Sequence, residues 1–145
     1  MDALKNILTR NSPRELTSPI PSKDEMHEIY KAALRAPDHA WLRPSRFIEV
    51  TGKGLDRLSK IFTEFAEQIE DVTPMQMEKY KSAPYRAPMI IVLVTKIAEH
   101  PKVPAIEQML STAAAVATAA IANGSRNGSS PSTLLAAALS YTSLP

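Results

Sequence analysis

The chain has 145 residues, of which 44% are hydrophobic and 22% charged, a composition typical of one globular domain. A formal net charge of +2 does not favour nucleic-acid binding, and the absence of cysteine excludes disulfides, thiolate metal sites and cysteine nucleophiles. No secretory leader is expected, and the longest strongly apolar run, Met89–Val94, is too short to span a bilayer. We therefore expect a cytoplasmic protein that binds neither membrane nor nucleic acid.

The first part of the chain predicts two helices. Apolar residues at helical spacing predict a short helix over Asp2–Arg10. A second helix should begin at Ser22, because Ser22 and Glu25 have the spacing of a capping box, and Pro37 should end it near Arg35. Its buried stripe should consist of Met26, Ile29, Ala33 and Leu34.

Two strands and three helices are predicted after this point. Phe47–Val50 is a strand pattern, and Met89–Thr95 lacks polar alternation, which indicates a strand buried on both faces. Met75–Ser82 predicts a short helix, and a long alanine-rich helix should run from Pro104 or Ala105 to about Asn123. An amphipathic helix is predicted over Leu55–Ile69, with an apolar face made of Leu55, Leu58, Phe62, Phe65 and Ile69.

This order of elements favours a layered α/β or α+β domain over residues 1–124. Two strands make a poor sheet, so further strands should come from the region after Gly124 or from another subunit. Residues 125–145 form an atypical tail that is rich in turn-forming residues. Within it we expect Leu134–Leu139 to form a helical turn.

Arg10-Asn11-Ser12, directly after the first predicted helix, is a candidate anion site. A guanidinium, a hydroxyl and loop amides can together hold a phosphate. The alternative is that Arg10 interacts with the dipole at the helix C-terminus while Ser12 forms a turn. Taken alone, the pattern favours this alternative.

A second charged cluster lies in the segment Arg35-Ala36-Pro37-Asp38-His39. Arg35 could pair with the oxygens of a cofactor and His39 could donate a ring N–H. Alternatively, Arg35 pairs with Asp38 and His39 is merely exposed. Trp41 could stack on a planar ring or belong to the core or an interface. The residues alone leave these alternatives open.

Other chemistries find no support in the chain. The histidines are too far apart for a helical metal site, and no serine lies in a nucleophile elbow. Gly52 and Gly54 lack the third glycine and the placement of a dinucleotide fingerprint. We therefore expect neither a metal nor a catalytic side chain.

The same two clusters belong to a longer pattern that covers residues 1–124. The chain resembles the compact bacterial NAD(P)H nitroreductases, a flavin-dependent family. The elements that carry the resemblance are Met1–Leu4, Arg10-x-Ser12, Arg35–His39, Arg43-Pro44, Arg46-Phe47, Ala83–Pro88, Lys102–Pro104, Glu107-Gln108 and Ala119–Gly124.

The resemblance implies a three-layer α+β fold and a homodimer with one FMN at each of two subunit interfaces. It implies that one subunit contacts FMN through Arg10, Asn11 and Ser12, and that the partner contributes Arg35 and His39. It assigns NAD(P)H to the segment Ala119, Ala120, Ile121, Ala122, Asn123 and Gly124. The implied activity is hydride transfer from NAD(P)H through flavin to a nitroaromatic or quinone acceptor, with the flavin supplying the chemistry.

Two departures from the family pattern lead to further expectations. Ser45 stands where relatives often carry tryptophan. After Gly124 the family's second phosphate-binding arginine and C-terminal strands have no clear counterpart, so we expect a truncated or frameshifted chain with an incomplete set of C-terminal strands. The alternative function is then an inactive flavin-binding or interaction module.

Overall fold

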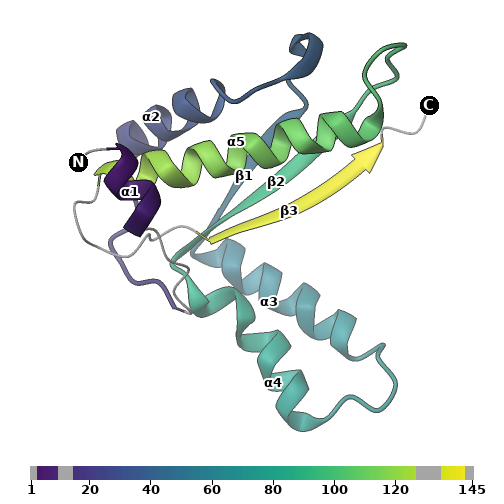
Figure 1. The fold of residues 1–145 in the computed structure, drawn as a ribbon. Coiled ribbons are helices and arrows are strands. Elements are labelled where there is room, and N and C mark those ends of the chain that lie inside the picture. The colour runs from purple at the N-terminus through teal and green to yellow at the C-terminus, as the bar shows by residue number, and fades with distance from the viewer. Residues whose placement is uncertain (1–2, 10–14, 127–134, 143–145) are drawn as a thin grey trace.

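The computed structural model describes residues 3–9, 15–126 and 135–142 (Figure 1). Its helices and strands, in chain order, are α1 (Ala3–Thr9), α2 (Lys23–Ala33), β1 (Ser45–Thr51), α3 (Lys53–Ala66), α4 (Pro74–Ser82), β2 (Met89–Ile97), α5 (Ala105–Arg126) and β3 (Leu135–Thr142). Short 3-10 helices, η1 (His39–Trp41) and η2 (Ala83–Arg86), precede β1 and β2. The predicted helices and both predicted strands are confirmed.

The three strands form one sheet in the order β1-β2-β3. β1 runs antiparallel to β2, with Phe47 opposite Leu93, and β3 runs parallel to β2, with Ala137 opposite Val92. Figure 1 shows α2 and α5 on one side of this sheet and α3 and α4 on the other. The expected three-layer α+β fold is therefore confirmed.

Strand β2 supplies apolar side chains to a core on each face of the sheet. Successive side chains of a strand point to opposite faces, so alternate residues of β2 enter different layers. One core joins β2 to α2 and α5 through Met26, Ile29, Ala33, Met89, Ile91, Leu93, Ala115 and Ala119. The other contains Leu55, Ala87 and Ile90. The prediction that this strand is buried on both faces is thus confirmed.

Helix α2 begins with the predicted capping box. The Glu25 amide donates to Ser22 Oγ at 3.3 Å, and the Ser22 amide donates to Glu25 Oε2 at 2.8 Å. Met26, Ile29 and Ala33 are buried as predicted. Leu34 is exposed, so its assignment to the stripe was wrong. The helix ends at Ala33, which places Leu34 at the C-cap and turns it away from the core.

Helix α3 has a shorter buried face than its sequence pattern predicted. Phe65 and Ile69 are exposed because the helix ends at Ala66 and its second half packs on α4 rather than on the sheet. Phe65 lies edge-on to Tyr80 of α4, with ring centroids 6.1 Å apart. Ser59 Oγ donates to the Lys81 carbonyl at 2.7 Å and so ties the two helices together.

Residues 135–142 form a strand, and the expected helical turn at Leu134–Leu139 was wrong. The run has low intrinsic strand propensity because it is rich in alanine. Its pairing along the buried strand β2 overrides that local preference. The division of the chain at residue 124 stays a prediction, although this strand joins the sheet of the preceding segment.

Helix α5 is attached to the end of β2 by one buried side chain. Gln108 is 1% exposed. Its Nε2 donates to the carbonyls of Ala98 at 2.8 Å and Val103 at 3.2 Å, while its Oε1 accepts from the Ala98 amide at 2.9 Å. These three bonds fix the first turn of α5 against the strand. By length and composition alone, Ala105–Asn123 could cross a membrane, with a mean hydropathy of 1.3, but its inner face packs on α2 and β2.

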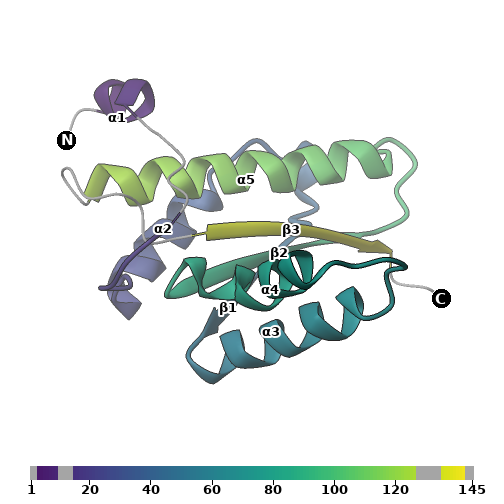
Figure 2. The same cartoon turned by 90° about the horizontal axis from the view of Figure 1, so that it is seen from below.

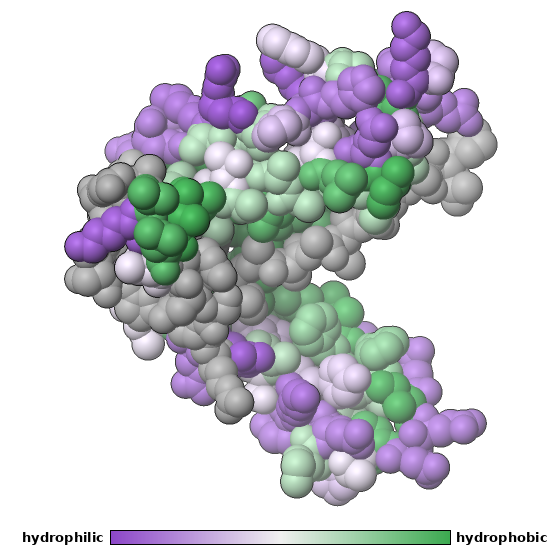
Figure 3. All heavy atoms as spheres, in the orientation of Figure 1, coloured by the Kyte–Doolittle hydropathy of each residue, from purple (hydrophilic) through white to green (hydrophobic). Residues whose placement is uncertain are grey.

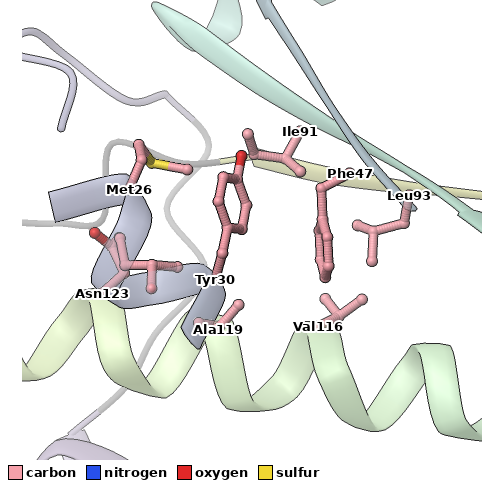
Figure 4. A pocket seen from close by; sticks show the side chains of 10 residues that line it. Met26, Tyr30, Phe47, Ile91, Leu93, Val116, Ala119 and Asn123 are labelled. Atoms are coloured by element: carbon pink, nitrogen blue, oxygen red, sulfur yellow. The ribbon is translucent and has the colours of Figure 1, made fainter. Parts of the chain in front are cut away.

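A cavity of about 60 Å³ lies between α2, the sheet and the C-terminal half of α5 (Figure 4). Its wall is apolar except near two residues. The phenol of Tyr30 donates to Glu49 Oε1 at 2.7 Å, and burial together with that carboxylate raises the pKa of Tyr30 well above its ordinary value. Asn123 is 2% exposed, and none of the described residues accepts a hydrogen bond from its Nδ2.

The two buried amide side chains of α5 should respond oppositely to the same substitution. Asn123→Leu removes an unpartnered donor and fills the cavity, so we expect the free energy of unfolding to rise by about 1–2 kcal/mol. Gln108→Leu leaves three backbone groups without partners and should lower it by at least about 2 kcal/mol. Urea unfolding of both variants checks this. A loss of stability in Asn123→Leu comparable to that in Gln108→Leu would contradict the assignment.

Candidate functional site

The loop between α2 and β1 is closed by its own polar groups. Asp38 Oδ2 accepts a hydrogen bond from the backbone amide of Arg43 at 2.7 Å. Arg46 Nη1 donates to the carbonyls of Arg43 and Ser45, both at 2.9 Å. Pro37 and Pro44 restrict the loop at either end. The loop therefore has a defined shape, and Arg46 has a structural task within it.

Three residues of this loop, none of them glycine, have left-handed backbone conformations. Their φ angles are 57° for Ala40, 56° for Trp41 and 47° for Arg43. This region costs a residue with a Cβ atom roughly 1–2 kcal/mol. Backbone strain of this kind persists where the surrounding structure enforces it, and it clusters at functional sites.

The imidazole of His39 contacts a carboxylate that is distant in the sequence. Its Nδ1 lies 2.5 Å from Glu107 Oε2, and the two side chains are 55% and 43% exposed. The contact joins Arg35–His39 to the first turn of α5, where Glu107-Gln108 lies. Sequence reasoning noted both elements but missed their pairing, since 68 residues separate them.

Arg35 follows α2 and is exposed. Among the residues that the structure describes, it forms no ion pair, and Asp38 instead accepts from the loop backbone. The alternative of an Arg35–Asp38 ion pair is therefore not realised there. Trp41 is 79% exposed, with the Arg43 guanidinium 5.8 Å from its ring centroid, so it does not belong to the core of this chain. Arg35 thus presents its side chain to solvent.

Of the other predicted contacts, the structure describes only the segment on α5. Arg10, Asn11 and Ser12 fall outside the described residues. Helix α1, which precedes them, lies beside the C-terminal half of α5 (Figures 1 and 2). The segment Ala119–Gly124 belongs to that half. Within it, Ala119 and Asn123 are buried against α2 and the sheet, whereas Ala120 is exposed.

Among the described residues, His39 and the Ala119–Gly124 segment do not come together. Glu107, which holds His39, and Asn123 are 16 positions apart on one helix (123 − 107), or roughly 24 Å at 1.5 Å per residue. The histidine and the Ala119–Gly124 segment thus mark opposite ends of α5. In the part of the chain that the structure describes, no cluster of three or more acidic or histidine side chains could hold a metal ion.

The strain in the loop can be tested by substitution. Ala40→Gly removes the steric cost of the left-handed conformation, so we expect a stability gain of up to about 1 kcal/mol after the larger chain entropy of glycine is subtracted. Ala113→Gly, at an exposed position within α5, should instead lose about 1 kcal/mol. Thermal unfolding compares the two. Equal losses in both variants would show that Ala40 is not strained.

Comparison with known proteins gives consistent results. Residues 7–127 match the model of the nitroreductase family. The chain is 36% identical over 129 residues to "Putative NAD(P)H nitroreductase YdjA" of Escherichia coli (strain K12), covering 86% of this chain and 69% of that protein.

Solved structures share the fold at lower identity. A nitroreductase-like family protein from Bacillus cereus superposes with a TM-score of 0.71 at 20% identity, covering 87% of this chain and 66% of that one. A nitroreductase with bound FMN from Desulfitobacterium hafniense DCB-2 gives 0.64 at 23% identity, with the same coverage. The chain thus spans about two thirds of the length of these relatives. The match over residues 7–127 shows that this chain belongs to the nitroreductase family.

Proposed function

We propose that the protein is a cytoplasmic, FMN-dependent oxidoreductase that transfers hydride from NAD(P)H through the flavin to a small acceptor such as a nitroaromatic or a quinone. Membership of the nitroreductase family over residues 7–127 carries this proposal. The similar protein from Escherichia coli is named for NAD(P)H, and a solved structure with the same fold contains FMN. The acceptor class rests on the family alone.

The described residues suit a phosphate-bearing cofactor. Arg35 presents an exposed guanidinium without an ion pair among the described residues, and His39 presents a half-exposed ring on a loop of defined shape. Guanidinium and imidazole N–H groups make charge-assisted hydrogen bonds to phosphate oxygens. When bound, FMN supplies the redox chemistry, and the task of these side chains is to bind and orient it. We assign Arg10, Asn11 and Ser12 to the same cofactor, and Ala119–Gly124 to NAD(P)H.

We further propose a homodimer in which two subunits share each flavin. The support is that His39 contacts the first turn of α5, whereas α1, which directly precedes Arg10 in the sequence, lies beside the C-terminal half of that helix. A second copy in the reverse direction would bring the α1 end of one chain to the His39 end of the other. Apolar side chains exposed on α1 and α5 suit such an interface, as the green surfaces in Figure 3 indicate. They are Leu4, Ile7, Leu8, Ile106, Met109 and Leu110.

Flavin binding tests the cofactor assignment. Arg35→Ala should weaken FMN binding by about 1.5–3 kcal/mol, because a charge-assisted contact to phosphate is lost, and Arg10→Ala should do the same. Arg57→Ala is the matched control, since it removes the same charge from the exposed surface of α3 on the other side of the sheet. Equilibrium dialysis measures the dissociation constants. Equal affinities of Arg35→Ala and Arg57→Ala would contradict the role of Arg35.

A catalytic assay separates the proposed enzyme from a non-catalytic flavin-binding module. We expect FMN-loaded protein to oxidise NAD(P)H in the presence of a quinone. Protein that retains FMN but leaves NAD(P)H unchanged would support the module, and protein that retains no FMN at tens of micromolar would contradict both functions.

The shared site predicts that assembly and flavin binding fail together. Leu110 on α5 is 60% exposed and Ile61 on α3 is 57% exposed, so they form a matched pair. Leu110→Glu should convert the dimer to a monomer and weaken FMN binding at least about tenfold, because burying a charge in an apolar interface is costly. Ile61→Glu should leave both properties unchanged. Sedimentation at micromolar concentration checks the assembly, and a monomer that binds FMN tightly would overturn the shared site.

A further inference from the structure

We propose that Glu107 is a positioning residue, whose carboxylate holds the imidazole of His39 through Nδ1 and thereby presents Nε2 to the ligand. The inference rests on the proposed function, in which His39 contacts the FMN bound mainly by the partner subunit. It adds to that function a residue that does not itself touch the cofactor.

The geometry engages one ring nitrogen and leaves the other available. Nδ1 of His39 lies 2.5 Å from Glu107 Oε2, and Nε2 bonds to none of the described residues. The two nitrogens of an imidazole point in nearly opposite directions, so a ring fixed through Nδ1 directs Nε2 away from the carboxylate. Both side chains are about half exposed, which leaves room for a ligand at Nε2.

The carboxylate also determines which nitrogen carries the proton. An ionised carboxylate only accepts hydrogen bonds, so Nδ1 of His39 must be protonated in this contact. In the neutral ring, Nε2 is then an acceptor, which suits a hydroxyl of the ribityl chain. In the protonated ring, Nε2 is a donor, which suits a phosphate oxygen. The ligand therefore meets Nε2 in either state.

The backbone at Glu107 is fixed by hydrogen bonds of the helix and of the neighbouring Gln108 side chain. Gln108, the next residue, makes three buried hydrogen bonds to the end of β2, and Ser111 Oγ donates to the Glu107 carbonyl at 3.0 Å. On the other side, His39 directly precedes the strained residues Ala40 and Trp41. Through its contact with Glu107, the loop residue His39 is therefore attached to a turn of α5 that is itself bonded to the end of β2. A simpler alternative is that the negative charge of Glu107, in the first turn of α5, only interacts favourably with the positive end of the helix dipole.

Nitrogen NMR of the imidazole separates these two interpretations without any cofactor. Spectra recorded at about pH 8, where an ordinary imidazole is neutral, report which nitrogen carries the proton. We expect the Nδ1–H form for His39 in the wild type and mainly the Nε2–H form in Glu107→Ala. Glu78→Ala on α4 removes an equal charge from an exposed helical site and should leave His39 unchanged. His39→Gln identifies the signal among those of His27 and His100.

FMN affinity then tests whether the orientation matters for the ligand. Glu107→Ala should weaken binding about threefold to tenfold, the range expected for one hydrogen bond. The same substitution in a His39→Ala background should have no further effect, because Glu107 acts through His39. An unchanged tautomer, an unchanged affinity, or an effect that persists without His39 would overturn the proposal. If the wild type binds no FMN, the proposed function fails, while the NMR comparison still decides whether Glu107 positions the ring.

Discussion

The burial of strand β2 on both faces is the constraint on which the rest of the fold depends. A strand with apolar side chains on both faces must be covered by two layers, and here α2 with α5 covers one face while α3 covers the other. Its two edges also need partners, because the backbone groups of a buried strand require hydrogen bonds. β1 and β3 supply them on either side. The three-layer arrangement follows from this one apolar segment.

At the start of α5, hydrogen bonds to a buried side chain fix a helical turn that also contacts a surface loop. Gln108 is buried and bonded to both sides of the turn that leaves β2, so the first turn of α5 has one orientation. Glu107 precedes it and faces outward, where it meets His39. Two adjacent residues thus have opposite environments and complementary tasks: the amide fixes the helix and the carboxylate fixes the loop. This explains in physical terms why an acid and an amide occur side by side at this point.

Local signals in the sequence predicted most of the fold correctly. The capping box at Ser22 and the unbroken apolar run of β2 each act within a few residues, and both appear as expected. Two of the errors, at Phe65 and at β3, share a different cause. Phe65 has the right periodicity, but α4, rather than the sheet, lies beside that part of α3. β3 has a poor local propensity and forms because a buried partner is available. Both outcomes depend on tertiary neighbours that the sequence pattern does not reveal.

The candidate site shows the same division between local and distant information. Residue chemistry alone singled out Arg35 and His39, because a cluster of charges at a proline-containing loop suits an anion or a cofactor better than a core. It could not choose between an Arg35–Asp38 ion pair and an exposed arginine, since that choice depends on where the loop backbone directs its amides. In the structure Asp38 accepts from the Arg43 amide, and Arg35 is exposed without an ion pair among the described residues.

The length of α5 bears on the proposed homodimer. His39 contacts its first turn, and α1 lies beside its C-terminal half, so the helix separates the two by more than the reach of any side chain. Apolar residues along its outer face have no partner layer in the described fold, because the sheet occupies only the inner face. A second copy that covers this outer face would bury those residues and join the separated contacts in one step. Stability of the assembly and formation of the flavin site are therefore expected to be linked.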